Sequence, residues 1–154
     1  MIIETNGRRK RVKVLSYYGT ATALSTARSY LAAASIGDYA LFGGGYSSTY
    51  SAVVDAYNAS LTRSTPTALS SARRYLAATS IGDYALFGGG YSSTYSAVVD
   101  AYNASLTRST PTALSVARSD LAAASIGDYA LFGGGWTSTY SAVVDAYNAS
   151  LTRS

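Results

Sequence analysis

The sequence predicts an all-β fold made of three similar units, each a small antiparallel sheet. The first observation is an internal repeat: residues 21–65, 66–110 and 111–154 align with a period of 45 residues, and the first two units agree at 41 of 45 positions. A repeat of this length is typical of arrays in which each unit buries its apolar surface only against its neighbours. The second observation is that the apolar runs within a unit are short and bounded by turn residues, which favours strands over helices.

Four strands are expected in each repeat. In the first repeat they cover residues 31–36, 39–42, 52–57 and 61–67. Gly37-Asp38 joins the first two as a two-residue turn, with glycine at the position where a type II′ turn requires a positive φ. Pro66 and Pro111 fall in the fourth strand, and proline is tolerated in a sheet only at an edge. The fourth strand is therefore expected to be the outermost.

The strand pattern also indicates how the sheets are arranged. The first three runs of each repeat are almost continuously apolar, which indicates sheets covered on both faces. Four-stranded antiparallel sheets with a proline-tolerant outer strand and two covered faces are the blades of a β-propeller. Propellers generally have four to eight blades, so three blades predict an incomplete ring.

Each repeat resembles the kelch repeat. The resemblance rests on residues 28–45, RSYLAAASIGDYALFGGG, and on residues 53–58, VVDAYN. These segments place an Arg before an apolar strand, a short turn, an aromatic-containing strand that ends in glycines, and a Tyr in the third strand. The resemblance covers residues 21–154 and is to bacterial or phage-type kelch-like repeats, without the tryptophan usual in the fourth strand. It implies a propeller that serves as a binding platform, in a ring of six or seven blades.

Residues 1–20 form a basic arm before the repeat domain of residues 21–154. Five cations and Glu4 in this arm account for the whole net charge of +4, because seven Arg balance seven Asp from residue 21 onward. A solvated strand or tail explains these cations more simply than nucleic-acid binding does. Nucleic acid is therefore not the expected partner, although the arm keeps it as an alternative. Residues 13–18 align with a fourth strand, and we expect them to form one.

Three blades leave one face of the first blade and one of the third uncovered. Two copies of the chain would form a six-bladed ring with two-fold symmetry, so a homodimer is the expected assembly; a fragment of a longer repeat protein is the alternative. The sequence has no apolar run of membrane-spanning length and no signal-peptide core. We therefore expect no membrane partner and a cytoplasmic or particle-associated location.

The composition excludes several kinds of chemistry. With no Cys and no His, the chain lacks the usual zinc ligands and the usual nucleophile pairs. The glycines do not form a phosphate-binding fingerprint, so no metal and no cofactor is expected. Asp38 is interpreted as a turn residue, and Asp55 as an ion-pair partner of Arg28 or Arg63. No catalytic residue is predicted, and the protein is not expected to be an enzyme.

The three repeats differ mainly in the loops at one end of the blades. The connections between the second and third strands and between successive repeats emerge at this end, whereas the Gly-Asp and Asn-Ala-Ser turns at the other end are identical. The varied residues are of types that dominate recognition surfaces. The predicted ligand-binding residues are Tyr30, Tyr46, Arg74, Tyr75, Tyr91, Asp120 and Trp136.

These residues predict a non-catalytic binding or scaffold module that recognises a protein or a glycan. The alternatives are a structural repeat protein of a cell surface or phage particle, a propeller enzyme, and nucleic-acid binding through the arm.

Overall fold

The computed structural model describes residues 2–5, 8–11 and 18–154. Its first two strands, β1 (Ile2–Thr5) and β2 (Arg8–Arg11), pair as an antiparallel hairpin. The strand expected at residues 13–18 lies outside the described residues except for Tyr18, which is 92% exposed and belongs to no strand. Within the described residues there is no helix long and apolar enough to cross a membrane.

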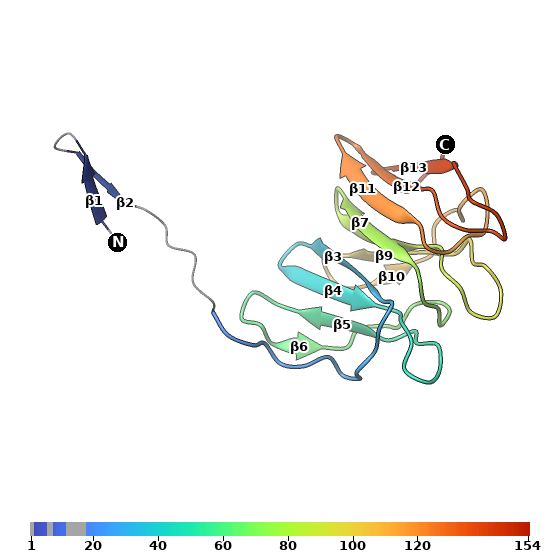
Figure 1. Cartoon of the computed structure of the whole chain (residues 1–154), viewed down its shortest axis with the longest axis horizontal. Helices are drawn as coiled ribbons and strands as arrows, with labels where there is room; N and C mark the ends of the chain where they lie inside the picture. The colour runs from blue at the N-terminus through green and yellow to red at the C-terminus, as the bar shows by residue number, and fades with distance from the viewer. Residues whose placement is uncertain (1, 6–7, 12–17) are drawn as a thin grey trace.

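The repeats fold into three antiparallel sheets, which confirms the all-β prediction and the incomplete set of propeller blades (Figure 1). The first sheet, called blade 1, has the order β3-β4-β5-β6. Its strands are β3 (Ala32–Ile36), β4 (Tyr39–Gly43), β5 (Val54–Tyr57) and β6 (Arg63–Ser64). Since β6 pairs only with β5 in this sheet, the fourth strand is the outermost, as predicted.

Blades 2 and 3 repeat this arrangement. Blade 2 contains β7 (Ala77–Ile81), β8 (Tyr84–Gly88), β9 (Val99–Asn103) and β10 (Arg108–Ser109). Blade 3 contains β11 (Ala122–Ile126), β12 (Tyr129–Gly133) and β13 (Val144–Asn148). A single bridge between Tyr147 and Arg153 takes the place of its fourth strand. The innermost strands β3, β7 and β11 lie beside one another, so the blades fan out from them (Figure 1).

The turns of each blade show how local chemistry sets the strand ends. Ile36 pairs with Tyr39, and Gly37 has a φ of 53° between them, so the predicted two-residue turn is confirmed. The prediction for the fourth strand was wrong in length, because β6 covers only two of the seven expected residues. The Asn58 side chain accepts hydrogen bonds from the backbone N–H groups of Ser60 and Thr62, each at 3.0 Å, and this capped turn delays the strand.

The prolines also lie differently from the prediction. Pro66 and Pro111 follow the short outer strands instead of lying within them, so their missing N–H groups remove no bond from the sheet. This part of the blade is an edge, as predicted. The prolines are tolerated there because they lie in an irregular segment after the outer strand.

Adjacent blades pack through two different apolar faces. The valine face of blade 1 consists of Ile36, Leu41, Val54 and Ala56, and the phenylalanine face of blade 2 consists of Leu69, Leu76, Ala85, Phe87 and Tyr102. The equivalent faces of blades 2 and 3 form the second core. Burying these side chains is the main favourable contribution to stacking, at about 25 cal/mol per Å² of apolar surface.

A glycine on each valine face receives the phenylalanine of the next blade. A Cβ added at Gly43 would lie 2.9 Å from the Phe87 ring, and one at Gly88 would lie 2.8 Å from the Phe132 ring. Real Cβ atoms do not approach a ring so closely, so these two positions require glycine for contact, not for backbone conformation. The glycine at the end of β4 and β8 is thus part of the junction between blades.

A buried ion pair in each blade connects the loop that enters the blade to its second and third strands. In blade 1, Arg28 Nη1 lies 2.8 Å from Asp55 Oδ2, while Arg28 Nε donates to the Gly44 carbonyl and Nη2 to the Phe42 carbonyl. The prediction that Asp55 pairs with Arg28 or Arg63 is confirmed, and both arginines contact it, Arg63 at 3.6 Å. Blades 2 and 3 contain the same pairs, Arg73 with Asp100 and Arg118 with Asp145.

Candidate binding surface

The varied loops of the three blades come together at one end of the structure. Ser29 and Tyr46 exchange backbone hydrogen bonds of 3.0 and 2.8 Å, which ties the loop entering blade 1 to the loop between β4 and β5. Arg74 with Tyr91 and Ser119 with Trp136 form the same pair of bonds in blades 2 and 3. The loop positions at which the repeats differ therefore share one surface, as the order of the strands predicted.

Three of the predicted residues form a row that runs from blade to blade. Tyr75 N donates to the Tyr30 carbonyl at 3.1 Å, and Asp120 N donates to the Tyr75 carbonyl at 2.9 Å. All three residues have a positive φ, between 55° and 58°, a conformation that is uncommon outside glycine. Such backbone strain is frequent where a protein aims side chains at a ligand.

Arg74 fills the space above the junction of blades 1 and 2. Its guanidinium carbon lies 4.7 Å from the ring centres of both Tyr46 and Tyr75, 5.6 Å from that of Tyr50 and 5.8 Å from that of Tyr30. Among the described residues it forms no ion pair, and its Nε is buried without a hydrogen-bond acceptor. Its charge is stabilised by aromatic faces, an interaction that strengthens when water is excluded.

The corresponding space above the junction of blades 2 and 3 is open. Ser119 stands at the position equivalent to Arg74, and its hydroxyl donates to the Asp120 carboxylate. The short serine leaves a cavity of about 290 Å³, here called the groove. The groove is lined by Arg74, Tyr75, Tyr91, Tyr95, Ser119, Asp120 and Trp136.

The structure brings all seven predicted site residues to this surface. Five of them line the groove, while Tyr30 and Tyr46 surround the Arg74 guanidinium in the neighbouring junction. Tyr50, Tyr95 and Ser119 also lie at this surface but were not among the predicted site residues. The tyrosines are identical in the repeats, so a comparison of repeats could not reveal them, whereas the change from Arg74 to Ser119 was a usable signal that a groove opens.

The ionisable groups beneath this surface are occupied in holding the blades together. Burial raises the pKa of Asp55, but hydrogen bonds from Ser25 and Arg28 outweigh it and bring the pKa below its usual value. The pKa of Asp145 is lowered in the same way, through Ser115 and Arg118. Within the described part of the chain, no cluster of three or more residues of the metal-ligating types occurs.

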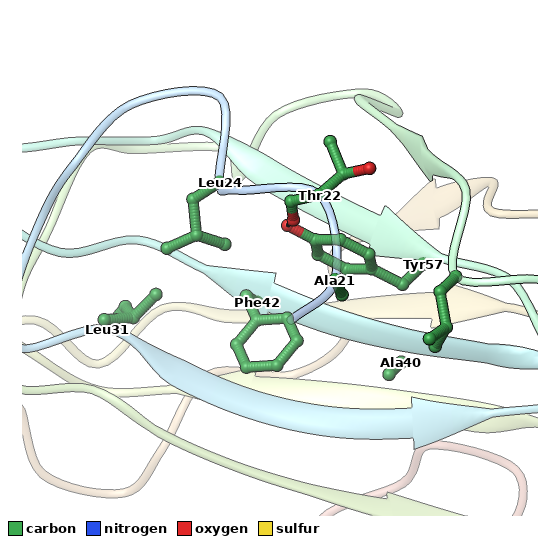
Figure 2. A pocket seen from close by; sticks show the side chains of 8 residues that line it. Ala21, Thr22, Leu24, Leu31, Ala40, Phe42 and Tyr57 are labelled. Atoms are coloured by element: carbon green, nitrogen blue, oxygen red, sulfur yellow. Dashed lines mark hydrogen bonds between the residues drawn. The ribbon is translucent and has the colours of Figure 1, made fainter. Parts of the chain in front are cut away.

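A larger apolar cavity, of about 530 Å³, lies on blade 1 and has a different character. Figure 2 shows Phe42 and Tyr57 in its wall, together with Leu24 and Leu31. The equivalent residues of blades 2 and 3 are covered by the preceding blade. This cavity is an unpaired phenylalanine face, not a separately built pocket, and it contains no charged side chain.

Comparison with solved structures defines the class of protein as a repeated all-β, propeller-like fold. The structure of YjhT matches with a TM-score of 0.76 at 15% sequence identity, over 87% of this chain and 46% of the YjhT chain. This chain thus spans less than half of that protein's length. Neither a family model nor a curated protein matches the sequence. In all, 127 chains of solved structures match, so the fold alone does not select a function.

Proposed function

We propose that this protein is a kelch-like recognition module that binds a glycan in the groove between blades 2 and 3. One observation carries the proposal: Ser119 replaces the arginine that fills the equivalent space one junction earlier, and so leaves an open site at the surface where the repeats diverge. A scaffold made of near-identical blades has no packing reason to change these positions. A binding site gives a reason for such changes, because recognition of a ligand needs side chains that differ from those of the neighbouring blade.

The lining of the groove suits a hydroxylated ring. Tyr75, Tyr91 and Trp136 offer aromatic faces on which a sugar ring stacks, and aromatic side chains with polar tips are frequent at such surfaces. The Asp120 carboxylate and the Ser119 hydroxyl accept hydrogen bonds from ring hydroxyls. A volume of about 290 Å³ is at the lower limit of ligand pockets, which corresponds to one ring and not to a long chain.

The same lining supports binding without catalysis. Glycoside hydrolysis generally uses two carboxyl groups on opposite sides of the bond, and the groove contains only Asp120. Asp55, Asp100 and Asp145 are paired with arginines beneath the surface, and Asp38, Asp83 and Asp128 lie in the two-residue turns at the other end of the blades. We therefore propose that the module recognises its ligand and releases it unchanged.

The proposal is tested on a panel of immobilised glycans, with binding in solution followed through Trp136. This residue is the single Trp of the chain and lines the groove, so its fluorescence reports occupancy directly. Ser119→Arg should fill the groove as Arg74 fills its neighbour and weaken binding at least tenfold. Ser105→Arg adds the same charge at an exposed position in the turn between β9 and β10, at the other end of the blade, and should bind normally.

Two results would contradict the glycan proposal. The first is that no glycan of the panel binds or changes the Trp136 emission. The second is that Ser119→Arg and Ser105→Arg bind with the same affinity. A protein ligand whose capture depends on the groove variant alone would keep the site and replace the glycan.

A further inference from the structure

Within the described residues, the first and last blades each have one apolar face that no other blade covers. On blade 1 this is the phenylalanine face: Ala40 is exposed, whereas the equivalent Ala85 and Ala130 are fully buried. Figure 2 shows this face from close by, with Phe42 at its centre. Phe42 is half-buried, whereas Phe87 and Phe132 have no exposed surface.

On blade 3 the unpaired surface is the valine face. Val144 is 58% exposed, compared with 1% for Val54 and 0% for Val99 in the same position of the preceding blades. Ile126, at 69%, shows the same contrast with its buried equivalents. The two terminal blades therefore expose the two complementary faces of a junction. Blade 3 exposes the valine face, which receives a phenylalanine ring in the internal junctions, and blade 1 exposes the phenylalanine face, which supplies one.

The contacts that each half lacks are known from the junctions inside the chain. Gly43 and Gly88 receive a phenylalanine ring, but a Cβ added at Gly133 would meet only Val144 at 3.3 Å. Within the described residues, no phenylalanine ring therefore lies over Gly133, and the Phe42 ring lies over no glycine of another blade. Both sides already have the shape that the internal junctions require.

The backbone repeats this complementarity. Gly45 N donates to the Arg73 carbonyl, and Gly90 N to the Arg118 carbonyl, each at 2.9 Å across a junction between blades. Within residues 18–154, Gly135 N forms no such backbone bond. The matching acceptor would be the carbonyl of Arg28, at the start of blade 1. A partner that supplies both Phe42 and this carbonyl at the correct spacing is a second copy of the chain.

We propose that two copies of this chain stack head to tail, with the phenylalanine face of blade 1 of each copy on the valine face of blade 3 of the other. The contact occurs twice and closes a six-bladed ring with two-fold symmetry. Six blades fall within the usual range for propellers, and no apolar blade face is left open.

Ring closure would also create a second type of groove, and this step rests on the proposed function. The position of Arg74 is occupied by Ser29 in blade 1, so the junction between copies is open in the same way as that of Ser119. Its walls would be Asp120, Trp136 and Tyr140 of one copy and Tyr46 of the other. Tyr140 is 91% exposed in the single chain, and pairing of two copies would cover it.

The assembly is tested by measuring mass against concentration with light scattering or sedimentation. The wild-type chain should have the mass of two copies and dissociate on dilution. Gly133→Ala adds one methyl group where Phe42 must lie, and should weaken association about tenfold or more. The single chain should remain folded, because Gly133 has an ordinary φ and little above it. Val116→Ala, in an exposed loop, is the matched control and should not change the mass.

A mixing experiment distinguishes head-to-tail stacking from other dimers. Phe42→Asp and Val144→Asp should each abolish dimer formation alone, because each disrupts both junctions of the ring. Mixed together, they should form a heterodimer through the one junction in which both faces are intact. The Trp136 emission should shift to shorter wavelength on pairing.

Several results would overturn the proposal, and none depends on any ligand. They are a monomeric wild-type chain at hundreds of micromolar, a Gly133→Ala mass profile identical to that of Val116→Ala, and a mixture that stays monomeric. Failure of glycan binding with a normal mass profile would reject the proposed ligand and leave the ring intact.

Discussion

Blade 2 meets blade 1 on one side and blade 3 on the other, and these two junctions differ chiefly above their shared core. Both cores contain the same Leu, Val, Phe and Tyr contacts, and in both a phenylalanine ring lies on a glycine. Above the first core lies Arg74 among tyrosines, whereas above the second lies an open groove beside Ser119.

The difference shows that stacking and surface chemistry are separable in this fold. The residues that hold the blades together lie on the strands and on the buried arginine at each loop end. The residues that shape the surface lie one or two positions away in the chain, such as Arg74 next to Arg73. A blade can therefore change what it presents without changing how it stacks.

The largest expected effect is on the core of an internal junction. Phe132→Ala should lower the free energy of unfolding by about 3–5 kcal/mol, because it leaves a cavity over Gly88. Phe42→Ala should cost much less in dilute protein, where blade 1 has no neighbour on that face. Urea denaturation at low concentration measures both. Equal losses would show that Phe42 is already covered within one chain.

The adjacent arginines provide the next test. Arg73→Met should lower the free energy of unfolding by about 3–5 kcal/mol, because it leaves Asp100 charged, buried and without its closest cation. Arg74→Met should cost about 1 kcal/mol, the size of a cation–π contact. Thermal melts of the two variants side by side make the comparison. A larger loss for Arg74→Met would mean that the surface cluster also carries the stacking.

The sequence predicted the blades well because their determinants are local. The Gly37 turn and the apolar runs depend on residues close together in the chain, and the 45-residue period repeats them in each blade. The fourth strand was predicted too long, because nothing in its propensity reveals that the Asn58 side chain caps a turn over the next four residues or that Leu61 adopts a φ of 58°. The pairing of β1 with β2 was not among the predictions.

The site was predictable in part for a different reason. Comparing the repeats identified Asp120 and Trp136, because these residues differ from their equivalents. The same comparison is blind to Tyr50 and Tyr95, which are identical in every blade and yet acquire a role beside Arg74 or the groove. Whether the space above a junction is filled or open depends on contacts between side chains of neighbouring repeats. The repeat period in the sequence does not reveal these contacts.

A smaller effect is expected from opening the first junction. Arg74→Ser should create a second groove in each chain, walled by tyrosines from blades 1 and 2. It should bind the glycan about tenfold more weakly than the natural groove, because Tyr75 stands where Asp120 supplies a charged acceptor. Calorimetry should detect one additional weak site per chain. An unchanged stoichiometry would indicate that the tyrosines close over the space.

The smallest effects near neutral pH come from titration, and they concern the core alone. The folded-state pKa of Asp55 and of Asp145 lies below the usual value, so each contributes stability that is complete above the unfolded pKa of about 3.9 and is lost as the pH falls through the folded pKa. At alkaline pH, burial and the Asp145 charge raise the pKa of Tyr147 to about 12, so the contribution of Tyr147 to stability is lost as the pH rises from about 10.

Chemical denaturation between pH 2 and pH 12 should therefore show a plateau of stability with a fall at each end. Tyr147→Phe should remove part of the alkaline fall and leave the acid fall unchanged. If this variant keeps the full alkaline fall, other tyrosines account for it, and blade 3 is not where alkaline unfolding begins.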